Sequence, residues 1–232
     1  MPKRTKKGTK SRVSVSEVFS SNRSNALENQ TLVTATLANE RLENQEKEIT
    51  AIAFIDPAVK DYQYLASAAL PGTEIIILDG RRDGIDQISE AISWRYKLRA
   101  IHIICSGSPG CLQVGSSEVS LEDLEEYTGV RSGLPTLRDW SDSLAKGAPI
   151  FIYGSSVAAG KIGTKFIKRF AKLTGASVVA SAKPTGSPAL GADWDLEVAT
   201  KKFTAPPLAF DAKMLASYKH SLDLEVWSYA AS

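Results

Sequence analysis

The chain has 232 residues, of which 43% are hydrophobic and 23% charged, and its formal net charge is +2. These values are typical of a globular protein, and the length fits one sizeable α/β domain with a tail. A membrane-spanning helix needs roughly 20 consecutive apolar residues, whereas the longest apolar runs, 75–78 and 101–104, are strand-sized. The sequence therefore predicts a soluble protein without a transmembrane segment.

The positive charge is concentrated at the N-terminus. Residues 1–12 contain no acidic residue, and their basic residues are Lys3, Arg4, Lys6, Lys7, Lys10 and Arg12. Taking these six charges from the net +2 leaves −4 for residues 13–232, so a specific nucleic-acid partner is not expected. The tail is a candidate for contact with anionic surfaces, or else a solubilising extension. It has no apolar core segment, so it is not predicted to be a Sec signal peptide.

The sequence has two cysteines, Cys105 and Cys111, which bracket five residues and could in principle meet across that turn. Two cysteines in a chain of this length do not form a disulfide framework, so reduced thiols are expected. Together with His102 and His220 they show no metal-ligand spacing. Neither a metal nor a cofactor is predicted.

The first 48 residues differ in composition from the rest. Residues 1–30 are rich in Lys, Ser, Asn and Thr, and cannot bury enough apolar surface to offset the entropy lost on ordering. Residues 31–48 could form a polar helix around Val33, Leu37 and Leu42. We therefore expect a flexible basic tail over 1–48, with a short helix.

From residue 49 onward, apolar strands alternate with amphipathic helices. Strands are predicted at 49–55, 74–78, 100–105, 149–153 and 177–180, with a further candidate at 194–198. Helices are indicated by apolar residues three and four apart within 62–69, 85–92, 137–144 and 162–170. A hairpin is predicted at 112–119. A short helix follows, with Ser120 and Asp123 as its capping box.

This alternation is typical of an α/β, doubly wound domain, in which helices cover both faces of a mostly parallel sheet in a three-layer sandwich. The domain is expected to span 49–220, followed by a C-terminal tail at 221–232.

In open parallel sheets, ligands bind beyond the carboxyl ends of the strands. The residues predicted there are Asp56, Asp79, Cys105, Ser106, Gly107, Gly154, Ser155, Ser156 and Ser181. The acids Asp56, Asp79 and Asp83 could form a cation site or a pocket for a basic side chain; alternatively, they are solvated loop acids that form turns.

Four ordered motifs surround these strand ends: FID to DY at 54–62, IHIICSGSPG at 101–110, YGSSVA at 153–158 and LGADWDLE at 190–197. Through them the chain resembles the bacterial domain-of-unknown-function 4347 family, from about residue 51 to about residue 218. The resemblance implies a relative of the caspase and gingipain type of cysteine peptidase. It also implies a place in large surface and adhesin-like proteins, with a cytoplasmic stand-alone form as the alternative.

The resemblance implies a catalytic His and Cys at the positions of Ser106 and Ser155. A caspase-type site needs a thiolate, a neighbouring imidazole and backbone N–H groups for the oxyanion. Ser155 would need a base, and Ser106 cannot serve as one. His102 lies about 13 Å from Ser106 along an extended strand, and Cys105 points to the opposite face. No catalytic residue is predicted; Ser106 and Ser155 are the positions of a degenerate dyad.

The glycines of the pattern remain at 107, 110 and 154. They either shape the turns only, or they keep a cleft whose backbone N–H groups bind a peptide or an acidic group. The predicted binding residues are Asp56, Asp79, Ser106, Gly107, Gly154, Ser155 and Ser156.

Three functions follow from these observations. The first is a non-catalytic binding, structural or assembly module with a protein partner. The second is a weak or cryptic hydrolase that uses Ser155. The third, compatible with the first, is an anchoring subunit held by the basic tail and by the polar face of the helix after the fourth strand, which carries Lys161, Lys165, Lys168, Arg169 and Lys172.

Overall fold

The computed structural model describes residues 49–129, 133–203, 206 and 209–224. The chain divides into two units, 1–47 and 48–232, and the description below concerns the second. The predicted flexible tail, its helix and its basic residues lie outside the described residues.

The described elements alternate between strands and helices for most of their length. In chain order they are β1 (Ala51–Ile55), α2 (Tyr62–Ser67), β2 (Thr73–Ile77), α3 (Gly84–Ile92), β3 (Ala100–Ile104), β4 (Ser106–Ser108), β5 (Cys111–Val114), β6 (Ser117–Val119), the 3₁₀ helices η1 (Asp123–Thr128) and η2 (Leu137–Asp139), α4 (Trp140–Ser143), β7 (Pro149–Ile152), α5 (Gly160–Thr174), β8 (Ser177–Ala180), the 3₁₀ helix η3 (Pro188–Leu190), β9 (Val198–Ala199) and α6 (Ala212–Ser217).

The main sheet has the order β2-β1-β3-β7-β8-β9, and only the edge strand β9 runs antiparallel to its neighbour. Both faces of its central strands are buried. In β1, Ile52 and Phe54 enter one hydrophobic cluster, whereas Ala53 and Ile55 enter a second. Burial on both faces explains why these strands are continuously apolar rather than alternating.

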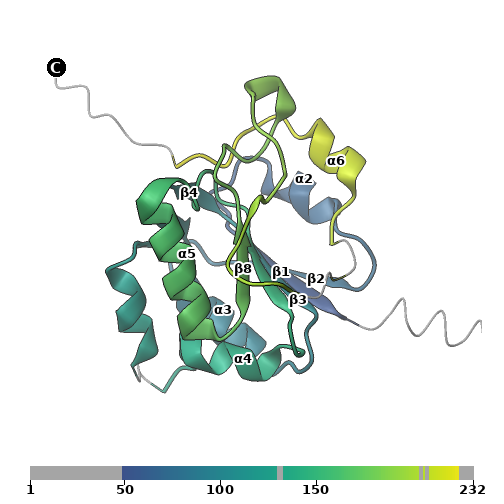
Figure 1. The fold of residues 1–232 in the computed structure, drawn as a ribbon. Coiled ribbons are helices and arrows are strands. Elements are labelled where there is room, and N and C mark those ends of the chain that lie inside the picture. The colour runs from purple at the N-terminus through teal and green to yellow at the C-terminus, as the bar shows by residue number, and fades with distance from the viewer. Residues whose placement is uncertain (1–48, 130–132, 204–205, 207–208, 225–232) are drawn as a thin grey trace, which may run out of the picture. The chain divides into compact units, whose positions relative to one another are not determined.

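Helices cover the two faces of this sheet: α3, α4 and α5 lie on one side, and α2 and α6 on the other (Figure 1). The predicted α/β class, with a mostly parallel sheet between helical layers, is confirmed. A separate antiparallel sheet, β4-β5-β6, follows β3 at the carboxyl end of the main sheet. The hairpin predicted at 112–119 forms its last two strands.

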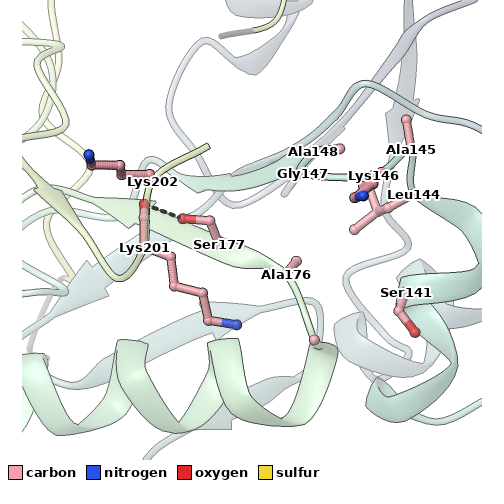
Figure 2. Close-up of a pocket in the computed structure, with 11 residues that line it drawn as sticks. Ser141, Leu144, Ala145, Lys146, Gly147, Ala148, Ala176, Ser177, Lys201 and Lys202 are labelled. Carbon is pink, nitrogen blue, oxygen red and sulfur yellow. Dashed lines mark hydrogen bonds between the residues drawn. The ribbon is translucent and has the colours of Figure 1, made fainter. Parts of the chain in front are cut away.

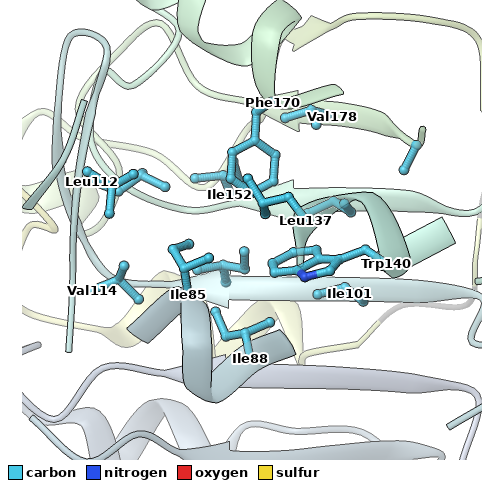
Figure 3. Packing of buried hydrophobic residues seen from close by; sticks show 14 of the residues in the cluster. Ile85, Ile88, Ile101, Leu112, Val114, Leu137, Trp140, Ile152, Phe170 and Val178 are labelled. Atoms are coloured by element: carbon cyan, nitrogen blue, oxygen red, sulfur yellow. The ribbon is translucent and has the colours of Figure 1, made fainter. Parts of the chain in front are cut away.

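The larger cluster packs around two aromatic rings. Trp140 and Phe170 are fully buried and meet edge to face, with ring centroids 5.7 Å apart (Figure 3). The indole Nε1 of Trp140 donates a hydrogen bond to Ser89 Oγ at 2.8 Å, and Ser89 Oγ donates to the carbonyl of Ile85 at 2.8 Å. The polar atoms of this core are therefore satisfied within it, as buried polar groups require.

Two local predictions differ from the structure. The further strand expected at 194–198 is reduced to β9, because the ring of Trp194 packs against Tyr153 and its Nε1 donates to the carbonyl of Leu215. The helix expected to be capped by Ser120 begins instead at Asp123, whose carboxylate accepts from the backbone N–H of Ser120 at 2.8 Å.

Within the described ranges, no helix combines the length and the apolar character that crossing a bilayer requires. Cys105 and Cys111 are both buried and free.

We expect Trp140→Phe to lower the free energy of unfolding by about 1–3 kcal/mol, because the smaller ring leaves unfilled space and Ser89 Oγ loses a donor. The matched change Trp94→Phe should stay within about 0.5 kcal/mol, since Trp94 is 81% exposed. Urea unfolding followed by far-UV circular dichroism measures both. Equal losses in the two variants would contradict this description of the core.

Candidate functional site

The ends of β3 and β7 approach each other closely at two glycines. A Cβ atom added at Gly107 would lie 2.9 Å from Gly154 Cα and 2.6 Å from Val157 Cγ2. One added at Gly154 would lie 2.8 Å from the same Val157 methyl group. Both separations are shorter than real Cβ contacts, so the backbone packing here requires glycine at each position. The predicted residues Gly107, Gly154 and Ser155 are thereby brought together.

The glycine contact aligns two backbone donors on a single acceptor. The N–H of Gly107 donates to the carbonyl oxygen of Leu222 at 3.0 Å, and the N–H of Ser155 donates to the same oxygen at 3.3 Å. Two N–H groups converging on one oxygen form the geometry that stabilises a carbonyl or an oxyanion. The oxygen that these two donors contact belongs to the protein's own chain.

The segment that supplies this oxygen, residues 220–224, was not predicted to be part of the site. Residues 221–224 were expected in a C-terminal tail, yet the Leu222 side chain is 1% exposed. A usable signal exists, because Ser221-Leu222-Asp223-Leu224 alternates polar and apolar residues, which is typical of a half-buried strand.

The Ser155 side chain is engaged in structural hydrogen bonds. Its Oγ accepts from the N–H of Thr185 at 2.9 Å and donates to the Thr185 carbonyl at 3.3 Å, and the residue is 1% exposed. Ser106 lies in β4, opposite Gln113, and is partly buried. Ser156 has a left-handed backbone, with φ 58°, and its N–H donates to the carbonyl of Lys183 at 2.8 Å.

His102 is buried in the sheet and cannot act as a base for Ser155. Its Nδ1 lies 3.2 Å from the hydroxyl of Tyr153, and its ring stacks on Phe151 with centroids 4.8 Å apart. Burial lowers the pKa of His102 to about 3, so the imidazole is neutral at pH 7. Its Nε2 and the Oγ1 of Thr185 are buried without a hydrogen-bond partner in the described part of the chain.

The two thiols are equally unsuited to nucleophilic chemistry. Burial raises the pKa of Cys105 far above its usual value, and the neighbouring Asp56 carboxyl adds to the effect. Burial and a hydrogen bond to Glu118 raise the pKa of Cys111 to about 12. Both remain thiols rather than thiolates at neutral pH.

Asp56, a predicted binding residue, is buried and hydrogen-bonded within the protein. It is 1% exposed, and its carboxylate accepts from the N–H of Ala58 at 2.8 Å and from the N–H of Gly115. Burial raises its pKa, against the lowering effect of these two hydrogen bonds. Asp56 therefore joins the end of β1 to the turn between β5 and β6 instead of facing a ligand.

The other loop acids are also paired locally. Asp79 accepts from the backbone N–H and the guanidinium of Arg81, whose side-chain hydrogen bond lowers the pKa of Asp79. Asp83 caps α3 and accepts from Ser117 Oγ at 2.6 Å and from the Tyr127 hydroxyl at 2.8 Å. Among the residues that the structure describes, no three acids, histidines or cysteines are grouped as a metal site.

A separate pocket of about 240 Å³ lies at the amino ends of β7 and β8, at the opposite end of the strands from the glycine contact (Figure 2). Three lysines line it, namely Lys146, Lys201 and Lys202, and none of its lining residues is acidic. The carbonyl of Lys201 accepts from Ser177 Oγ at 2.9 Å. None of the predicted site residues lines this pocket.

Comparison with known proteins gives one match. Residues 52–222 match the model of a family described as a domain of unknown function (DUF4347). No curated protein and no solved structure matches the chain.

We expect His102 to make the protein sensitive to mild acid. Its pKa is about 3 in the folded state and about 6.5 in an unfolded chain. Between these values the unfolded state binds a proton that the folded state does not, so stability falls as pH drops below about 6.5. Protonation of His102 in the unfolded state should lower the free energy of unfolding by about 2 kcal/mol between pH 7 and pH 5.

Urea unfolding of the protein and of His102→Gln at both pH values measures this contribution. The variant should lose about 2 kcal/mol less on acidification, while Asp56 titrates in both proteins and so cancels. The same pH dependence in His102→Gln and in the unsubstituted protein would contradict the buried neutral imidazole.

Proposed function

Because the chain belongs to the DUF4347 family, whose model covers residues 52–222, we propose that it is a non-catalytic domain of caspase-like fold. It binds a protein partner or joins a larger assembly. The observation that carries the proposal is the state of Ser155, whose buried hydroxyl is held by both backbone groups of Thr185.

The chemistry around Ser155 supports a site without catalysis. A serine nucleophile needs a general base within hydrogen-bond reach. Among the described residues, the partner of Ser155 Oγ is a peptide group, which cannot take up its proton. The residue that would carry the base in a caspase-type dyad is Ser106. The nearest histidine in the sequence, His102 in β3, is hydrogen-bonded to the Tyr153 hydroxyl.

The backbone donors support a retained binding role. The N–H groups of Gly107 and Ser155 still converge on a carbonyl oxygen, and main-chain donors do not depend on which side chain the position carries. A site that has exchanged its reactive side chains while keeping these donors can bind a peptide carbonyl without cleaving it.

The wider setting follows the resemblance to surface and adhesin-like proteins, which favours a role at the cell surface. Contact with an anionic surface through the N-terminal basic residues is a compatible part of this proposal. Those residues lie outside the described part of the chain, so their role stays a prediction.

The test compares the full chain with Ser155→Ala, using a peptide library and a serine-directed phosphonate probe. We expect no turnover and no labelling with either protein. Ser155→Ala should instead lower the free energy of unfolding by about 1–3 kcal/mol, because the buried N–H of Thr185 loses its acceptor. The matched Ser116→Ala, at an exposed serine, should stay within about 0.5 kcal/mol.

Turnover or labelling that disappears in Ser155→Ala would overturn the proposal in favour of a hydrolase. Unchanged stability in Ser155→Ala would contradict the structural role of the hydroxyl.

A further inference from the structure

The segment 220–224 lies as an added strand between β4 and the loop 185–187, and the position that it occupies is called the groove below. On one side, Gly107 donates to the carbonyl of Leu222, and Gly107 O accepts from the N–H of Leu224 at 3.0 Å. The opposite edge of β4 is already paired with β5. The segment therefore extends this small sheet at the outer edge of β4.

The other edge of the segment is paired as well. The N–H of Leu222 donates to the carbonyl of Thr185 at 2.8 Å, and the N–H of Ser187 donates to the carbonyl of His220 at 2.9 Å. With the donor from Ser155, the segment is bound through main-chain groups on both sides. This is the pattern by which a protein binds an extended peptide as an extra strand.

One side chain fixes the position of the segment. Leu222 is buried in the hydrophobic cluster with Ile55, Ile104 and Tyr218, whereas the adjacent Asp223 is exposed. Because successive side chains of a strand point to opposite sides, the groove selects an aliphatic residue at one position and leaves the next in water.

The wall of the groove is shaped for close backbone approach. Gly186 has φ 136°, and a Cβ atom added there would lie 2.4 Å from His220 O and 2.8 Å from Ser221 Cα. An alanine at this position would collide with the bound segment itself. A Gly186→Ala substitution therefore alters the groove without changing the sequence of the segment 220–224.

The segment is tethered firmly just before the groove. Tyr218 is buried, its hydroxyl donates to the carbonyl of Lys60 at 2.5 Å, and its ring meets Trp194 with centroids 5.6 Å apart. A strand tethered this closely acts at an effective concentration in the millimolar range, so it masks the groove from peptides in solution.

We propose that this groove is a binding site for an extended peptide with an aliphatic residue at the Leu222 position, and that residues 220–224 are its intramolecular occupant. The site rests on the proposed non-catalytic function and assigns its ligand class. Release of the segment exposes the Gly107 edge, the Gly186 wall and the Leu222 pocket to a peptide of the same pattern.

The test uses the full chain and a fluorescent synthetic peptide with the sequence of residues 219–225, followed by fluorescence anisotropy. Leu222→Asp should weaken the intramolecular strand, so this variant should bind the peptide at least tenfold more tightly than the unsubstituted protein. Adding Gly186→Ala to it should abolish that gain. A peptide carrying the Leu222→Asp change is the matched control and should bind neither protein.

Equal or absent binding in a folded Leu222→Asp variant would overturn the inference. If far-UV circular dichroism shows that Leu222→Asp is unfolded, Leu222→Ala takes its place in the same assay. Hydrogen exchange of the unsubstituted protein gives an independent result. The amides of Gly107 and Ser155 should exchange at least tenfold faster than that of Ile103, through local release of the segment. Exchange at the core rate would show a permanent strand and overturn the inference.

The two proposals fail in different ways. Mass spectrometry of the bound peptide separates them, because cleavage that requires Ser155 would overturn the non-catalytic function and still identify the groove's ligand. A folded, open variant that takes no peptide would overturn only the groove.

Discussion

Gly107 and Gly154 pack backbone against backbone where the strands β3 and β7 end, and a side chain at either position would collide with Val157 or with the opposite main chain. This contact brings two N–H groups from segments 48 residues apart in the sequence to one point. The donor pair is therefore a product of how the sheet ends, and a substitution at a reactive side chain leaves it in place.

The sequence predicts the main sheet better than it predicts this site. Continuous apolar runs identify the central strands, since burial on both faces leaves no polar positions. The short strands β4 and β9 carry no such pattern, because β4 has the sequence Ser-Gly-Ser and β9 has only two residues. Leu222 illustrates the limit: its carbonyl is bound by Gly107 and Ser155, and neither partner is near it in the sequence.

Asp56 shows the converse error. An acid directly after a buried strand is reasonably expected at a solvent-filled strand end, where it could meet a ligand. Here the turn at Gly115 folds back over it and supplies a backbone donor. A carboxylate that receives two N–H groups can remain buried, so a residue type suited to binding serves instead to join two parts of the domain. Only the long-range position of the β5–β6 turn distinguishes the two roles.

Three polar side chains at this end of the sheet carry no charge at neutral pH, which limits the kind of ligand that the groove can bind. His102 is kept neutral by burial and Cys105 remains a thiol, while Ser155 is bonded to a peptide group. In the described part of the chain, the groups that contact the Leu222 carbonyl are uncharged backbone donors. Two such donors balance the partial charge of a carbonyl oxygen without any charged side chain. The electrostatics and the strand geometry thus lead to the same class of ligand, a neutral peptide backbone in extended form.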